Sequence, residues 1–225
     1  MLAKVLSCAV VGLDGVLIEV EVDVGTGQPG MVLVGLPDAA VQESRERVRA
    51  AIRNSGGKFP HGRVTVNLAP ADLKKAGPTY DLPIAIGILL GSNQIAGDLS
   101  DALIVGELSL DGIVRHTPGI ISMVSRAAER GLVRAFVPES DAREAALVNG
   151  VTVYPVRTLA DLVNHLTGDV PVAPVEPGSG ADHAPFSSTA TDFADVRGQE
   201  HVKRGLEVAA AGAHNLVHVW NITPV

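Results

Sequence analysis

The fold is decided by the run D81-L-P-I-A-I-G-I-L-L90, in which one acid is followed by nine uncharged residues. An aspartate is a favoured helix N-cap, and the proline at position 83 is tolerated in a first turn. A helix that is apolar on all sides is normally buried on all sides. We therefore expect Asp81 to cap a central buried helix over residues 82–90, with the rest of the domain packed around it.

The chain before this helix is rich in strand patterns. Residues 2–12, 16–24 and 31–35 are apolar or alternate, and in the second run valines and Ile18 alternate with acids. Such a period of two is typical of half-buried strands, so a strand meander is expected to open the domain. Residues 38–54 change to a helical period with Asp38 as the cap, and residues 64–68 form a further strand.

The chain after the helix alternates between strand and helix. The pattern predicts a hairpin over 105–114 that turns at Asp111-Gly112, and a final strand that ends at Pro155. Helices are expected at about 119–131, 139–148 and 158–167, with strands at 103–106, 136–137 and 151–154. A meander followed by alternating units favours an α+β fold, a two-layer α/β sandwich over residues 1–167.

Residues 168–191 are rich in Pro, Gly, Ser and Thr and are predicted to be a linker. Residues 192–225 then have a polar start, a helical pattern at about 198–212 and a short strand-like run, as at the beginning of a nucleotide-binding unit. No G-x-x-x-x-G-K-[ST] follows, since no glycine comes after Gly212 and no lysine after Lys203. We therefore expect no triphosphate site, because no loop of free amides and no lysine is present to hold phosphate.

Composition narrows the class of protein. The net charge of −7 argues against a globally basic nucleic-acid binder. The single cysteine, Cys8, is expected to be a buried apolar residue, and the seven histidines show no metal-binding spacing. No basic leader with an apolar block and no long apolar run is found, so a cytoplasmic location without membrane contact is the expectation.

One segment is locally basic. Between Gln42 and Lys75 there are eight Lys or Arg against three Asp or Glu, and Arg45, Arg49 and Arg53 follow one helix face. Lys74 and Lys75 close the segment. These cations are either a solvated face or a contact for DNA phosphates or an acidic partner.

The run K74-K-A-G-P-T-Y-D81 can be interpreted in two ways. Thr79 could be a nucleophile activated by a nearby base, or Thr79 and Asp81 could bond the amides at the start of the helix. Glu107 could similarly be a general acid or a solvated residue of the hairpin.

These motifs resemble a known family. V66-N-L-A-P-A-D-L-K-K-A-G-P-T-Y-D-L-P-I-A85, V105-G-E-L-S-L-D-G112 and residues 34–56 are similar to the ComM (YifB) family of magnesium-chelatase-like AAA+ ATPases. D195-V-R-G-Q-E200 and residues 209–216 resemble the start of that family's ATPase module, so the resemblance covers residues 1 to about 219.

The resemblance implies a fold like that of the Lon protease domain, shared with part of a ribosomal protein, followed by a truncated AAA+ start. It places Thr79, in G77-P-T79, at the position of the Lon serine, and Ile121 at the position of the Lon lysine. The peptidase dyad is then lost, because isoleucine cannot activate a hydroxyl. Val196 and Gln199 would be at most remnants of an adenine pocket.

For the whole family the resemblance implies a hexameric, ATP- and Mg-dependent motor on branched DNA in recombination and natural transformation. For this chain it implies an inactive accessory domain without a cofactor, with weak DNA contact, and with homo-oligomers only alongside the full AAA+ module. The alternatives are a degenerate Lon-like peptidase and a nonfunctional truncation product.

Overall fold

The computed structural model describes residues 2–176 and 197–215 of the 225. The chain divides into two units, Met1–Asp182 and His183–Val225, and each is described by itself. The second contains helix α6 (Glu200–Ala211), where the sequence predicts a helix. The strand-like run after it lies outside the described residues.

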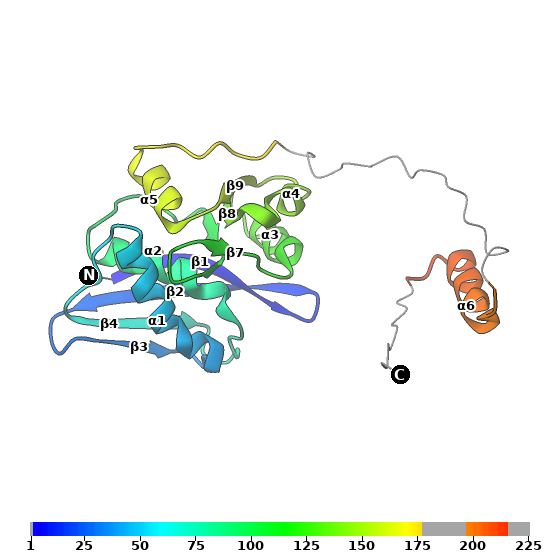
Figure 1. Ribbon diagram of the computed structural model, residues 1–225, viewed down its shortest axis with the longest axis horizontal. Coiled ribbons are helices and arrows are strands. Elements are labelled where there is room, and N and C mark those ends of the chain that lie inside the picture. Colours follow the sequence, from blue (N-terminus) through cyan, green and yellow to red (C-terminus); the bar gives the residue numbers. More distant parts are fainter. Residues whose placement is uncertain (1, 177–196, 216–225) are drawn as a thin grey trace. The chain divides into compact units, whose positions relative to one another are not determined.

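The first unit is built on one large sheet, drawn from blue to yellow-green in Figure 1. Its strands are ordered β3-β4-β2-β1-β5-β8-β9. A small second sheet pairs β6 with β7, which confirms the predicted hairpin. The strands are β1 (Leu2–Val11), β2 (Asp14–Gly25), β3 (Gly30–Val34), β4 (Arg63–Ala69), β5 (Ala102–Ile104), β6 (Glu107–Leu108), β7 (Val114–Arg115), β8 (Arg134–Pro138) and β9 (Thr152–Val156).

The prediction of an opening strand meander is confirmed for β1 and β2 but not for β3. β1 and β2 pair antiparallel along their length, as expected. β3, however, pairs parallel with β4 at the edge of the sheet, because helix α1 (Ala39–Asn54) carries the chain across between them. A crossover helix returns the chain parallel to the strand that it left. Alternation alone predicts a strand but not its neighbour.

Helix α2 (Asp81–Gly91) is the central helix that the sequence predicts, and only Leu90 in it is not buried. It packs on β1 and β2, and a methyl group added at Gly87 would lie 2.6 Å from Cγ2 of Val22. The predicted cap is wrong, because Tyr80 occupies the N-cap position and the Asp81 carboxylate is turned toward α1.

Helices lie on both faces of the sheet, so the two-layer expectation needs correction. In β8, Phe136 belongs to the core that contains α1, α2 and α5 (Leu159–Thr167), whereas Ala135 and Val137 belong to the core of α3 (Ile120–Glu129) and α4 (Ala142–Ala145). Because neighbouring strand residues point to opposite faces, these cores lie on opposite sides. The architecture is mixed α/β with a mostly parallel sheet.

Two boundaries differ from the prediction. The helix expected over 139–148 is reduced to the 3₁₀ turn η2 (Glu139–Asp141) and the short α4. Pro155 lies within β9 rather than ending it, and β9 is an edge strand, where proline is tolerated. Val175, in the predicted linker, donates its N–H to the Val153 carbonyl at 2.9 Å, so this residue contacts the first unit.

Candidate functional site

The exposed face of α1 presents unneutralised cations. Arg45, Arg49 and Arg53 are all exposed, and none has a carboxylate within ion-pair distance in the described residues. Arg45 and Arg53 instead donate to carbonyls of their own helix, those of Gln42 and Arg49, at 3.1 and 3.3 Å. The predicted basic face is therefore present as an exposed surface whose arginines are not neutralised by ion pairs.

Of the other basic side chains predicted to contribute to this face, one is exposed and one is buried. The Arg49 guanidinium lies 5.1 Å from the ring centroid of Phe59, which holds it against the surface. Lys74 is exposed, but Lys75 is fully buried, and its Nζ donates to the carbonyl of Pro70. Burial lowers the pKa of Lys75. The proposed phosphate contact by Lys75 is therefore corrected, because a side chain without exposed atoms cannot reach DNA.

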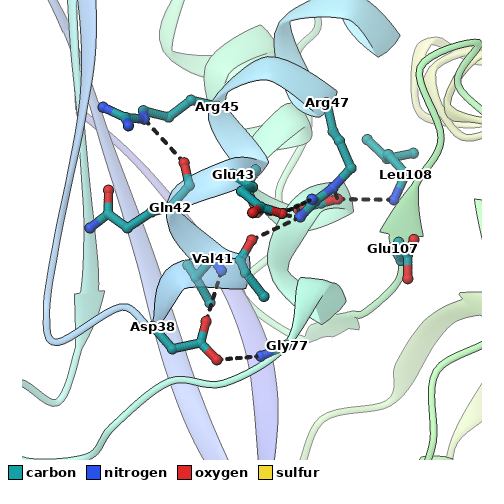
Figure 2. A network of polar contacts seen from close by, with 12 residues as sticks. Asp38, Val41, Gln42, Glu43, Arg45, Arg47, Gly77, Glu107 and Leu108 are labelled. Carbon is teal, nitrogen blue, oxygen red and sulfur yellow. Dashed lines mark hydrogen bonds and ion pairs between the residues drawn. The ribbon is translucent and has the colours of Figure 1, made fainter.

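The opposite side of α1 carries a buried ionic network (Figure 2). Arg47 Nε donates to Asp81 Oδ2 at 2.6 Å, the Ser44 hydroxyl donates to Oδ1, and the Leu108 N–H lies 3.3 Å from Oδ2. Figure 2 shows Arg45 and Arg47 on different sides of the helix. Burial raises the pKa of Asp81, while the bonds from Arg47 and Ser44 oppose the rise; the same bond raises the pKa of Arg47.

This network ties α1 to the start of α2 and to the β6–β7 hairpin. The Asp81 side chain has no exposed surface, and that of Arg47 is one-fifth exposed. No substrate could reach the carboxylate without displacing Arg47. The cluster therefore positions the basic face of α1 and is not itself a reaction site.

The two positions predicted for the lost dyad line different cavities. Thr79, in the 3₁₀ turn η1 (Pro78–Tyr80), lines a cavity of about 240 Å³. Ile121 lines a different cavity, beside the β1–β2 turn, and is 41% exposed. Neither Thr79 nor Asp81 caps α2 with its side chain, so the capping interpretation is wrong.

The cavity of Thr79 contains a histidine that sequence reasoning missed. His116 Nδ1 lies 2.5 Å from Oδ1 of the buried Asp141, and this contact raises the pKa of His116. Cys8 lines the same cavity, but burial raises the pKa of its thiol to about 11, so it is not a thiolate at neutral pH. Glu107 also lines it and lies 3.6 Å from Arg115.

The remaining predictions concern the remnants of an adenine pocket, a metal site and membrane contact. Gln199 precedes α6 with a left-handed backbone, and Val196 lies outside the described residues. Among residues 2–176 and 197–215, no cluster of His, Cys, Asp and Glu could hold a metal ion. In that same part of the chain, no helix has the length and apolar character needed to cross a membrane.

Comparison with known proteins identifies the family. Residues 20–141 match the family model described as subunit ChlI of Mg-chelatase, and residues 192–221 match that of magnesium chelatase, subunit ChlI. Competence protein ComM of Haemophilus influenzae is 43% identical over 96% of this chain, and YifB of Escherichia coli is 41% identical over 93%. The chain belongs to the ComM/YifB family of Mg-chelatase-like proteins.

This ComM/YifB-family chain spans less than half of its relatives, covering 43% of ComM and 40% of YifB. An uncharacterized protein of Mycobacterium tuberculosis is 45% identical over 96% of this chain and 42% of its own length. Lon protease 2 of Bacillus subtilis is 25% identical over 57% of this chain and 23% of its own length. The likeness to Lon is therefore confined to part of the chain.

Proposed function

We propose that this chain is the N-terminal accessory part of a ComM-like AAA+ ATPase that drives DNA branch migration in recombination and natural transformation. The exposed row Arg45, Arg49 and Arg53 is the observation that carries the proposal. A fold related to the Lon protease domain, a cytoplasmic location and the inactivity of this chain belong to the same proposal. The name of one relative, competence protein ComM, agrees with it.

The distribution of charge supports contact through one side of the domain. On β2, Val20 and Val22 point into the core that contains α1, so Glu19 and Glu21 between them point to the opposite face. That face carries an acidic row, only partly offset by Lys4. A polyanion is therefore favoured at the α1 face and disfavoured at this acidic row, which supports one orientation of the domain on DNA.

The expected affinity of a single chain is low. The α1 face and Lys74 offer about three to four phosphate contacts, and each changes the slope of log affinity against log salt by about −0.9 on duplex DNA. Binding by one chain should be near the non-specific range, on the order of 10⁻⁴–10⁻⁶ M. Several copies held in a ring by the ATPase module, which would also bind ATP and Mg, would raise this by avidity.

Fluorescence anisotropy with a four-way junction and a matched duplex, at several salt concentrations, tests the proposal. The Arg45/Arg49/Arg53→Ala variant should bind more weakly and with a shallower salt slope. A matched control is Arg130/Arg143/Arg157→Ala, which removes the same charge from exposed positions around α3, α4 and β9. If both variants bind like the unmodified chain, or lose affinity equally, the α1 face is merely solvated and the proposal fails.

A peptidase function is not supported, since Ile121 has no atom that accepts a proton and lies on another cavity than Thr79.

A further inference from the structure

The cavity beside Thr79 has features that the DNA proposal does not use, and no residue of α1 lines it. It holds about 240 Å³ between the end of β1, the η1 turn and the segment that leads into α3. Its walls combine hydroxyl, carboxylate and imidazole groups with apolar surface. The residues that define it are Cys8, Val10, Thr79, Glu107, His116 and Thr117.

Thr117 carries an unsatisfied polar atom on the wall of this cavity. The residue is 1% exposed, and its Oγ1 has no hydrogen-bond partner in the described part of the chain. Its backbone N–H donates to Asp141 Oδ2 at 2.8 Å, so that carboxylate oxygen is engaged by the backbone and not by the hydroxyl. A buried hydroxyl without a partner costs stability. A hydrogen-bonding ligand in the cavity would remove that cost.

β1 adds a row of open backbone groups. Cys8–Val11 pair with β2 on one side, whereas on the other side, within the described part of the chain, β1 is in register with β5 at Leu6 alone. A strand directs its N–H and C=O groups alternately to both sides, so the segment Cys8–Val11 has an open edge. Cys8, Ala9 and Val10 of this segment line the cavity together with Thr117, so the open edge and the residue with the unsatisfied hydroxyl border the same space.

We propose that this cavity binds an extended peptide segment, which pairs with the open edge of β1 and places one side chain beside Thr117. Strand addition of this kind takes affinity from backbone hydrogen bonds and specificity from side-chain pockets. A residue in a sheet occupies roughly 160 Å³, from the rise and the strand and sheet spacings. The cavity therefore encloses about one to two residues of the peptide, and the rest lies along the surface.

The partner is a peptide rather than a nucleic acid because of the charge around the cavity. The lining groups include the carboxylate of Glu107, and the buried carboxylate of Asp141 stands behind His116. Lysine and arginine side chains are absent from the lining. A phosphate-bearing chain would find no counter-charge beyond His116, whereas peptide N–H and C=O groups match both the open edge and the hydroxyls.

The test uses four fluorescein-labelled heptapeptides of sequence AVTXTVA, with Ser, Lys, Glu or Leu at X, titrated against the 225-residue chain by anisotropy. At least one should bind saturably, and Thr117→Val, which removes only the hydroxyl, should weaken it about two- to tenfold, the worth of one neutral hydrogen bond. Thr79→Trp should abolish binding by filling the cavity. Unchanged far-UV circular dichroism would show that each variant is folded.

Ser7→Ala is the matched control. Ser7 is also a buried hydroxyl without a partner, on the strand next to Cys8, but it does not line the cavity. Both Thr117→Val and Ser7→Ala should raise the melting temperature, and only Thr117→Val should weaken peptide binding. The proposal is overturned if no peptide binds up to about 1 mM, if both variants bind alike, or if a single-stranded oligonucleotide displaces the peptide.

Discussion

Arg47 and Arg45 are two residues apart on α1, yet they have different roles. Arg47 holds the buried carboxylate of Asp81, while Arg45 is exposed and, among the described residues, bonds only its own helix. Replacing Arg47 by Leu leaves a buried carboxylate without its counter-ion, which should lower the free energy of unfolding by about 3 kcal/mol. Arg45→Leu should change it by less than about 0.5 kcal/mol. Urea unfolding of both variants measures the difference, and equal losses would contradict the assignment.

His116 should make stability depend on pH. Its pKa is raised by Asp141, so the folded chain binds this proton more tightly than the unfolded chain. The contribution is fully present below the ordinary histidine pKa of about 6.5 and is lost as pH rises through the folded value. Because the side chain is 65% exposed, solvent screening limits it to about 0.5 kcal/mol.

The measurement is urea unfolding of the unmodified chain and His116→Gln from about pH 5 to about pH 9. Glutamine keeps a hydrogen-bond donor but does not titrate. The difference between the two chains should be largest at the acid end. If the difference in free energy of unfolding is constant, or grows with pH, the contact with Asp141 does not make the folded chain hold the His116 proton more tightly.

At this scale the sequence predicts residue types better than partners. The row Arg45, Arg49 and Arg53 could be predicted because helical spacing alone sets it. The sequence could not predict the burial of Lys75 or the turn of Asp81 toward α1, because both depend on contacts between distant segments. The spacing of Ser44 and Arg47, facing inward near Val41 and Val48, is the signal that could have revealed the partners of Asp81.

Among the elements, α2 approaches β2 closely at Gly87. A Cβ at Gly87 would meet Val22 Cγ2 at 2.6 Å, and Val22 is β-branched and stiff. Gly87→Ala should therefore lower the free energy of unfolding by about 1–3 kcal/mol, despite the better helix propensity of alanine. In the background of Val22→Ala the same change should cost much less.

A double-mutant cycle by urea unfolding isolates this coupling. Additive effects of Gly87→Ala and Val22→Ala would mean that the two elements do not meet as closely as described.

Most elements could be predicted because period and caps are local. Asp38 caps α1 through a 2.8 Å bond from the Val41 N–H, as the sequence indicates. The place of β3 beside β4, and of helices on both faces, depends on chain crossings that no local pattern records. The prediction that Pro155 ends its strand was wrong for a similar reason. Proline breaks the central strands of a sheet but is tolerated in an edge strand, and the sequence does not show that β9 lies at an edge.

For the whole molecule, the 225 residues contain no G-x-x-x-x-G-K-[ST]. We therefore predict that this chain does not bind ATP. A ligand that binds only the folded state must raise its stability, so millimolar Mg-ATP should leave the melting temperature unchanged. A saturable upward shift in differential scanning fluorimetry would show that a triphosphate site exists elsewhere in the chain.

The central claim is that the α1 face of this ComM/YifB-family chain contacts DNA. A titration of ¹⁵N-labelled chain with a four-way junction, followed by two-dimensional amide NMR, tests it most directly because weak binding is sufficient. The account predicts that amide signals of Arg45, Arg49 and Arg53 shift progressively, while those of Glu19 and Glu21 on the acidic face do not. Shifts confined to the acidic face, or no shifts at low salt, would contradict it.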